Sequence, residues 1–163
     1  MIREVYALKI NKKLLIICLV IPLAAGGIAA LLTGGGMDVF ETLNKPPLSP
    51  PGWLFPVAWT ILYILMGIAS YLVLEAGESQ TITKRAIWLY GIQLVFNFLW
   101  PIFFFNLSAY LFSFIWLVVL WLLILATTVL FYRIRDIAGH LMLPYLAWVA
   151  FAGYLNLGIY LLN

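Results

Sequence analysis

Long apolar segments alternate with short polar ones along the whole chain. Five apolar segments are each about as long as the ~20 residues that cross a bilayer as a helix, and glycine, proline and polar residues separate them. The pattern predicts an all-α polytopic membrane protein, a five-transmembrane-helix bundle forming a single domain over residues 1–163. We expect the helices at about 14–32, 52–74, 84–105, 109–132 and 140–162.

The composition supports a membrane location. Hydrophobic residues make up 66% of the chain and charged residues 9%, with a mean hydropathy of +1.09, whereas soluble domains carry about 25% charged residues. The chain therefore has too little polar surface to cover a particle that faces water. The net charge of +3 is not a sign of nucleic-acid binding, and we expect no nucleic-acid partner.

The nine Lys and Arg residues divide unequally between the two membrane sides that five spans create. Eight lie before the first span or in the second and fourth loops, and only Lys45 lies on the other side. Because cytoplasmic loops carry an excess of Lys and Arg, we expect a cytoplasmic N-terminus and an outward C-terminus. Residues 1–32 also fit a secretory signal peptide, but their apolar run is long enough to span, which favours a retained helix.

Few residue types in the predicted spans could carry chemistry. No Asp, Glu, Lys or Arg lies deep in a span, which argues against ion-coupled transport because such transporters place ionisable groups at membrane depth. His140 is the only histidine and Cys18 the only cysteine. We therefore expect no metal site and no intrachain disulfide.

Amides and aromatic rings recur at helical spacing. Residues three or four positions apart share a face of a helix, and an unpaired amide is costly in hydrocarbon, so these faces should point into the bundle. The faces hold Trp59 and Tyr63 in the second predicted helix, Gln93, Asn97 and Trp100 in the third, and Tyr145, Trp148, Ala152 and Asn156 in the fifth.

Two interpretations of these faces stay open. Flat rings and a few neutral amides suit a pocket for planar hydrophobic ligands. Amides also join helices inside membranes, and Trp and Tyr also sit at membrane interfaces. The interfacial interpretation fits Trp88, Trp116 and Trp121, whereas Trp53 fits either a pocket or an interface.

The loop between the first two predicted spans should act as a lid. Residues 34–36 are three glycines that allow a mobile start, and residues 38–43 fit one short amphipathic turn. The end of the loop is stiff because its prolines fix the backbone. These are Pro46, Pro47, Pro50 and Pro51.

The loop and the aromatic faces carry a set of motifs that together are specific. They are Asn44-Lys45-Pro46, Pro50-Pro51-x-Trp53, Trp59, Leu62-Tyr63, Met66-Gly67, Gln93-Leu94-x-x-Asn97-x-x-Trp100, Pro144-Tyr145-Leu146-x-Trp148, Ala152 and Leu155-Asn156. With these motifs the chain resembles the translocator protein family, which includes tryptophan-rich sensory proteins and peripheral-type benzodiazepine receptors. The resemblance covers roughly residues 20–160.

The resemblance implies a ligand pocket under the first loop. Family ligands include porphyrins such as protoporphyrin IX, isoquinoline-carboxamides, benzodiazepines and sterols, and many members are dimers. No cation follows Tyr154 or Tyr160, as the sterol motif of animal members requires, so dedicated sterol binding is in doubt. The expected ligand-binding residues are Trp53, Trp59, Tyr63, Gln93, Asn97, Trp100, Tyr145, Trp148, Ala152 and Asn156.

We therefore expect a protein that binds porphyrins and other planar hydrophobic ligands in an intramembrane pocket. The expected role is tetrapyrrole sensing, transport or photo-oxidative breakdown, with porphyrin as ligand or substrate and no required cofactor. In the case of breakdown, Trp59 and Trp148 would be the catalytic electron partners. The expected partners are the lipid bilayer, the porphyrin and a second copy of the chain. The alternative is a membrane structural or assembly subunit whose aromatic and amide residues only pack.

Overall fold

The computed structural model describes residues 10–76 and 79–163, most of which are helical. In chain order the elements are α1 (Lys12–Leu32), α2 (Gly36–Thr42), α3 (Leu54–Glu75), α4 (Gln80–Pro101), the π-helix η1 (Ile102–Asn106), α5 (Tyr110–Ile134) and α6 (Asp136–Leu162). Within the described residues, five helices are long and apolar enough to cross a membrane, with η1 extending the third span. The predicted all-α, five-span fold is thereby confirmed.

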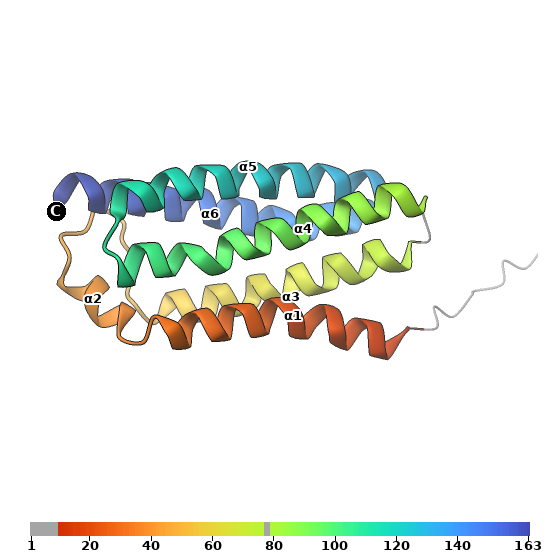
Figure 1. Ribbon diagram of the computed structural model, residues 1–163, viewed down its shortest axis with the longest axis horizontal. Helices are drawn as coiled ribbons and strands as arrows, with labels where there is room; N and C mark the ends of the chain where they lie inside the picture. Colours follow the sequence, from red (N-terminus) through yellow and green to blue (C-terminus); the bar gives the residue numbers. More distant parts are fainter. Residues whose placement is uncertain (1–9, 77–78) are drawn as a thin grey trace, which may run out of the picture.

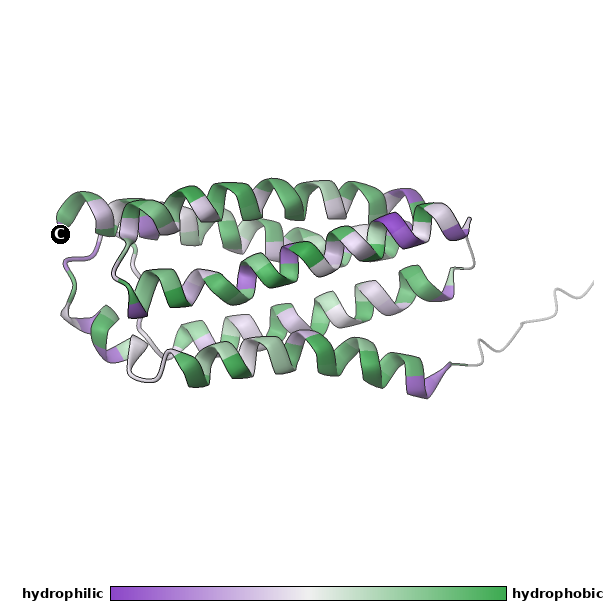
Figure 2. Ribbon diagram, viewed as in Figure 1, coloured by the Kyte–Doolittle hydropathy of each residue, from purple (hydrophilic) through white to green (hydrophobic). Residues whose placement is uncertain are grey.

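The five spans run side by side along the length of the molecule (Figure 1), and the contacts between neighbouring spans close a ring. α1 lies beside α3, α3 beside α6, α6 beside α5, α5 beside α4, and α4 beside α1. The short helix α2 lies at the end of the bundle where the chain reaches residue 163. Figure 2 shows hydrophobic residues along the length of every span, with hydrophilic residues gathered mainly toward the two ends. Such a surface suits helices surrounded by lipid.

Two helices begin four residues earlier than hydropathy predicts. α4 begins at Gln80 rather than 84, and α6 begins at Asp136 rather than 140. These first turns include polar residues such as Gln80 and Asp136, so an apolar window misses them, yet they can be helical outside the hydrocarbon. Asp136 also favours a helix start, because the N-terminal end of a helix stabilises negative charge. Only Arg135, in an extended conformation, separates α5 from α6.

The helix type changes after Pro101. Proline has no N–H to donate and crowds the preceding turn, and the chain continues as η1, where the Leu107 N–H donates to the Ile102 carbonyl at 3.2 Å. This wider turn carries Phe104 and Phe105 at the end of the bundle that α2 covers.

α1 and α3 approach each other closely at Gly67. A Cβ atom added there would lie 2.8 Å from the Cys18 carbonyl oxygen and 2.9 Å from the Leu19 Cα. Glycine thus brings the two backbones into contact, as small residues commonly do between membrane helices.

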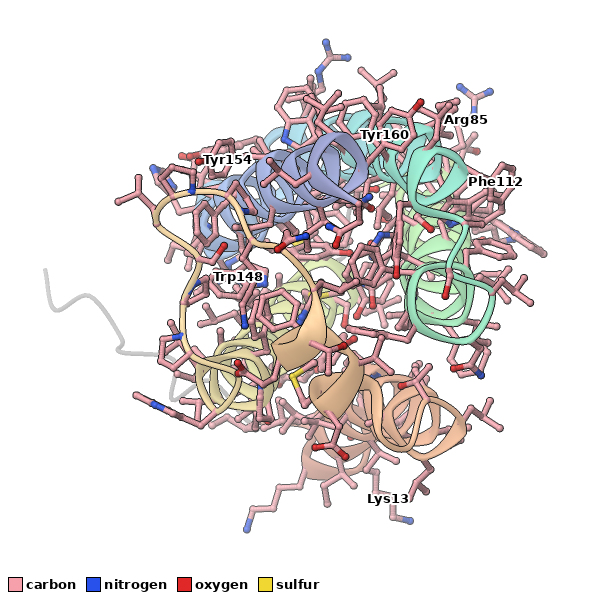
Figure 3. The ribbon with its side chains drawn as sticks, turned by 90° about the vertical axis from the view of Figure 1, so that its left-hand side faces the viewer. Lys13, Arg85, Phe112, Trp148, Tyr154 and Tyr160 are labelled. Carbon is pink, nitrogen blue, oxygen red and sulfur yellow. The ribbon has the colours of Figure 1, made fainter. Side chains whose placement is uncertain are left out.

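Residues 43–53, which we call the strap, join α2 to α3 and are fastened to α6. The Asn163 side chain donates to the Asn44 carbonyl at 3.0 Å and accepts from the Asn44 N–H at 3.0 Å. The Tyr154 hydroxyl donates to the Pro47 carbonyl at 2.8 Å. Figure 3 shows Tyr154 on α6 beside the strap. Pro46 also packs where a Cβ at Gly158 would lie, 2.5 Å from the proline Cγ.

Candidate functional site

A cavity of about 470 Å³ lies beneath α2. Its walls come from α1, α3, α4, η1 and α6, and α5 adds no lining residue among those described. Figure 3 looks onto this end of the bundle, with α2 and the strap in front. The volume falls within the range of small-molecule sites. Ala30 on α1 and Thr60 on α3 line the cavity and are also exposed, so between these two helices the cavity lies close to the outer surface.

Aromatic rings from α3 and α4 form much of the wall. Trp59 stacks on Tyr63, with ring centroids 5.5 Å apart and planes 27° apart. Trp100 packs against Phe104 at 5.4 Å, and its indole N–H donates to the Asn156 side-chain carbonyl at 3.1 Å. Such walls offer flat, electron-rich faces to a planar ligand.

A chain of buried hydrogen bonds runs from the cavity into the bundle. The Tyr63 hydroxyl donates to Asn97 Oδ1 at 2.7 Å, and Asn97 Nδ2 donates to the Tyr145 hydroxyl at 3.1 Å. The Tyr145 hydroxyl in turn donates to Gln93 Oε1 at 2.8 Å. The chain ends at Gln93 Nε2, which is buried and has no partner among the described residues. Three helices are therefore joined through one amide of the cavity wall.

Replacing Tyr145 with phenylalanine tests this chain. The change leaves Asn97 Nδ2 and Gln93 Oε1 without their partner, so the free energy of unfolding should fall by about 1–3 kcal/mol. Unfolding in detergent, followed by circular dichroism, measures the change. Tyr160→Phe is the matched control, because Tyr160 is 41% exposed. Equal stability of the two variants would show that the buried chain contributes nothing.

Six of the ten expected ligand-binding residues line the cavity. They are Trp59, Tyr63, Asn97, Trp100, Ala152 and Asn156. Gln93 and Tyr145 are fully buried behind this wall and reach it through Asn97. The structure thus supports a shared inward face for these eight residues, although their contact with a ligand stays a prediction.

The other two candidates lie outside the lining. Trp53 precedes α3 and is 67% exposed. Trp148 lies behind Phe55, with ring centroids 6.0 Å apart, and its buried indole N–H has no partner among the described residues. Figure 3 shows Trp148 where α6 faces α3. Phe55 itself lines the cavity, so it lies between Trp148 and the cavity.

Sequence reasoning missed the wall that α1 provides. Gly26, Gly27 and Ala30 line the cavity, and none of them is among the expected ligand-binding residues. The signal was the absence of side chains: the Tyr63 ring occupies the place where a Cβ at Gly26 would lie. The missed aromatic lining residues are Phe40, Phe55, Phe104 and Phe105.

The roof carries the charges nearest the cavity. Asp38 is the charged lining residue among those described, and it is exposed. The Lys45 ammonium lies 2.7 Å from the Glu41 carboxylate and 4.9 Å from the centre of the Phe40 ring. The hydrogen bond from Lys45 lowers the pKa of the Glu41 carboxyl. The pair is therefore present at neutral pH and weakens as the pH falls through that lowered pKa.

The site offers stacking and shape rather than acid–base or metal chemistry. In the part of the chain that the structure describes, no group of three or more His, Cys, Asp or Glu residues could hold a metal ion. His140 lies at the start of α6, where its Nδ1 lies 2.8 Å from the Asp136 carbonyl. A neutral, planar, hydrophobic group matches this cavity best.

These features define an integral membrane protein with five spans and an apolar cavity under a short helix. The chain belongs to the TspO/MBR family, whose sequence profile matches residues 18–162. It is 38% identical to the tryptophan-rich protein TspO of Chlorobaculum tepidum, over 94% of this chain and 99% of the relative. It is 37% identical to protein CrtK of Rhodobacter capsulatus, over 85% and 86%, and 34% identical to the translocator protein of Bos taurus, over 83% and 82%. The family resemblance read from the motifs is thereby confirmed.

Proposed function

We propose that the protein binds porphyrins, with protoporphyrin IX as the representative ligand, in the cavity beneath α2. The observation that carries the proposal is the stacked pair Trp59 and Tyr63 on the wall of an apolar cavity of about 470 Å³. A planar macrocycle can stack on such a face, and Asn97 supplies a neutral polar group beside it. No resident cofactor is required, because the porphyrin itself is the ligand or substrate.

A spectroscopic titration tests the proposal. Adding protoporphyrin IX to the full chain in lipid nanodiscs should quench tryptophan fluorescence with saturation, and an isoquinoline-carboxamide should displace the porphyrin. An assembly subunit whose aromatics only pack should give linear, non-saturable quenching. Linear quenching of tryptophan fluorescence that the isoquinoline-carboxamide does not reverse would therefore overturn the binding function.

Light-dependent breakdown of the bound porphyrin is a second candidate function. It is favoured by the position of Trp59, an electron-rich indole on the cavity wall that stacks on Tyr63. Under illumination in air, the porphyrin absorption band should decay faster with the parent protein than with Trp59→Phe, because phenyl is a poor electron donor. Equal decay in both proteins, at equal porphyrin occupancy, would leave binding as the function without breakdown.

We also propose that α2 closes over the ligand while the strap stays fixed. Gly34 and Gly35 precede α2, whereas the strap is held by the Asn44–Asn163 and Tyr154–Pro47 hydrogen bonds. Hydrogen exchange over residues 36–42 should therefore slow when porphyrin binds, because ligand contact orders the segment. Residues 44–49 should change much less. Unchanged exchange over 36–42 would contradict closure by α2.

The proposed orientation places the N-terminus in the cytoplasm. Every Lys and Arg of the described residues except Lys45 belongs to the end of the bundle opposite α2, and such residues favour the cytoplasmic side. With Cys18 replaced, single cysteines at Gly35 and Asn163 should react with a membrane-impermeant maleimide added outside intact cells. Labelling only after the cells are opened would show that both positions face the cytoplasm and that the proposed orientation is wrong.

A homodimer is proposed on the family resemblance. The small residues of α1 are partly used within one copy, because Gly26 meets the Tyr63 ring and Ala29 is 4% exposed. Another surface is therefore expected to join two copies. Light scattering with subtraction of the detergent mass should give twice the 18.4 kDa chain mass, and the mass of one chain would contradict the dimer.

A further inference from the structure

A shallow groove runs along the lipid-facing side of α4 and α5, at the end of the bundle opposite the cavity. One polar and two basic side chains, Thr81, Lys84 and Arg85, line its outer part. Below them the groove is lined by Trp88, Leu89, Ile92 and Leu130. The residues of α4 follow the three- and four-residue spacing of one helix face. The groove is thus basic at its end and apolar along its length.

The two cations are exposed and uncompensated in the described part of the chain. Among residues 10–76 and 79–163 the structure has one ion pair, Lys45 with Glu41, at the other end of the molecule. Figure 3 shows Arg85 pointing away from the bundle. The described residues of this end carry six Lys and Arg but only the acids Glu75 and Asp136. The groove therefore has charge complementarity to an anion.

The apolar part requires that the anion carry a hydrocarbon chain. Trp88 is 74% exposed and Ile92 is 43% exposed, so both are available to lipid. From Arg85 to Ile92 the helix rises about 10 Å, which is less than half of the ~30 Å hydrocarbon core. Trp commonly lies at the boundary between headgroups and acyl chains. The cations thus match the headgroup level and Ile92 the acyl-chain level.

We infer that this groove binds an anionic glycerophospholipid, with the phosphate against Lys84 and Arg85 and an acyl chain along Trp88 and Ile92. A soluble anion would leave the apolar part uncovered, and a zwitterionic lipid would bring a compensating cation to the basic end. The site shares no lining residue with the porphyrin cavity. The inference therefore stands independently of the proposed function.

Native mass spectrometry of the full chain, titrated with phosphatidylglycerol or phosphatidylcholine of equal chain length, tests the site. The parent protein should prefer phosphatidylglycerol. The double variant K84Q/R85Q should lose affinity for it about 25-fold, because each cation near an anionic lipid contributes about fivefold. The charge-conserving K84R/R85K should bind as the parent does. A parent protein without preference, or a loss in K84R/R85K equal to that in K84Q/R85Q, would overturn the inference.

Two further variants separate the groove from general attraction. K12Q/K13Q removes the same charge from the same end but from α1, and Figure 3 shows Lys13 on the side of the bundle away from Arg85. It should change phosphatidylglycerol binding less than about twofold, since exposed charges more than ~10 Å apart are largely screened. Ile92→Trp keeps both cations but fills the apolar part, and should weaken binding several-fold. Equal losses in both glutamine variants, unchanged binding in Ile92→Trp, or displacement of the lipid by millimolar inorganic phosphate would each contradict a lipid groove.

Discussion

Replacing Trp59 with alanine should weaken the binding of protoporphyrin IX by about 2–4 kcal/mol. Trp59 lines the cavity and stacks on Tyr63 with centroids 5.5 Å apart. The substitution removes the apolar area of the indole ring that a porphyrin would cover, together with an aromatic contact of about 0.5–1.5 kcal/mol. The shift of the porphyrin absorption band on binding measures the affinity without relying on Trp59 fluorescence.

Two other tryptophan variants show whether the effect belongs to the cavity. Trp148→Ala should weaken binding less than Trp59→Ala, because Phe55 lies between Trp148 and the cavity. Trp121→Ala should lower thermal stability but leave affinity unchanged, because Trp121 lies on α5 outside the cavity lining and its N–H donates to the Leu146 carbonyl of α6. Parent-like affinity in Trp59→Ala would show that the aromatic wall does not hold the ligand.

Replacing Gly67 with leucine should lower the free energy of unfolding by about 3 kcal/mol, the upper end of the usual cost of overpacking. A Cβ there meets the Cys18 carbonyl oxygen at 2.8 Å and the Leu19 Cα at 2.9 Å. Both are backbone atoms of α1, so no side-chain rotation relieves the clash and the helix itself must move. Unfolding in detergent, together with the fraction recovered as a single species by size-exclusion chromatography, measures the effect.

Gly91→Leu is the matched control for Gly67→Leu. Gly91 lies in the middle of another span, α4, and nothing among the described residues lies within 4 Å of a Cβ built there. Its leucine variant should retain or slightly raise stability, because glycine is a poor helix residue. If the two leucine variants lost the same stability, the contact between α1 and α3 would not explain the effect.

Hydropathy and helical spacing were sufficient to predict the five-span fold and the inward direction of the aromatic and amide faces. A membrane span is set by length and apolarity, and the inward faces follow from the cost of an unpaired amide in hydrocarbon. Asn97 illustrates the success, since it both lines the cavity and joins Tyr63 to Tyr145. The same reasoning did not show that Gln93 and Tyr145 lie one layer behind the wall. The position of a residue on a helical face shows whether its side chain points into the bundle. How far that side chain lies from the cavity depends on which neighbouring side chains fill the space.

The remaining features depend on contacts that a sequence pattern does not contain. Phe55 separates Trp148 from the cavity only because the packing of α3 against α6 brings the two rings together. Gly26 contributes to the wall by leaving room for the Tyr63 ring, and the missing side chain could equally have served contact with another helix. The first turns of α4 and α6 lie outside the apolar windows, so hydropathy alone predicted the start of both helices four residues too late.

The hydrogen bonds between Asn44 and Asn163 link residues 119 positions apart in sequence. Through the strap, these hydrogen bonds connect Asn163, which follows α6, to α2 at the roof of the cavity. Coupling between two sites is reciprocal: if this connection strengthens ligand binding, a bound ligand must strengthen the connection by the same factor. With such coupling, a spectroscopic label at residue 163 would report cavity occupancy from outside the cavity. By the same coupling, a fusion partner that disturbed the Asn44–Asn163 hydrogen bonds would change the affinity of the cavity for its ligand.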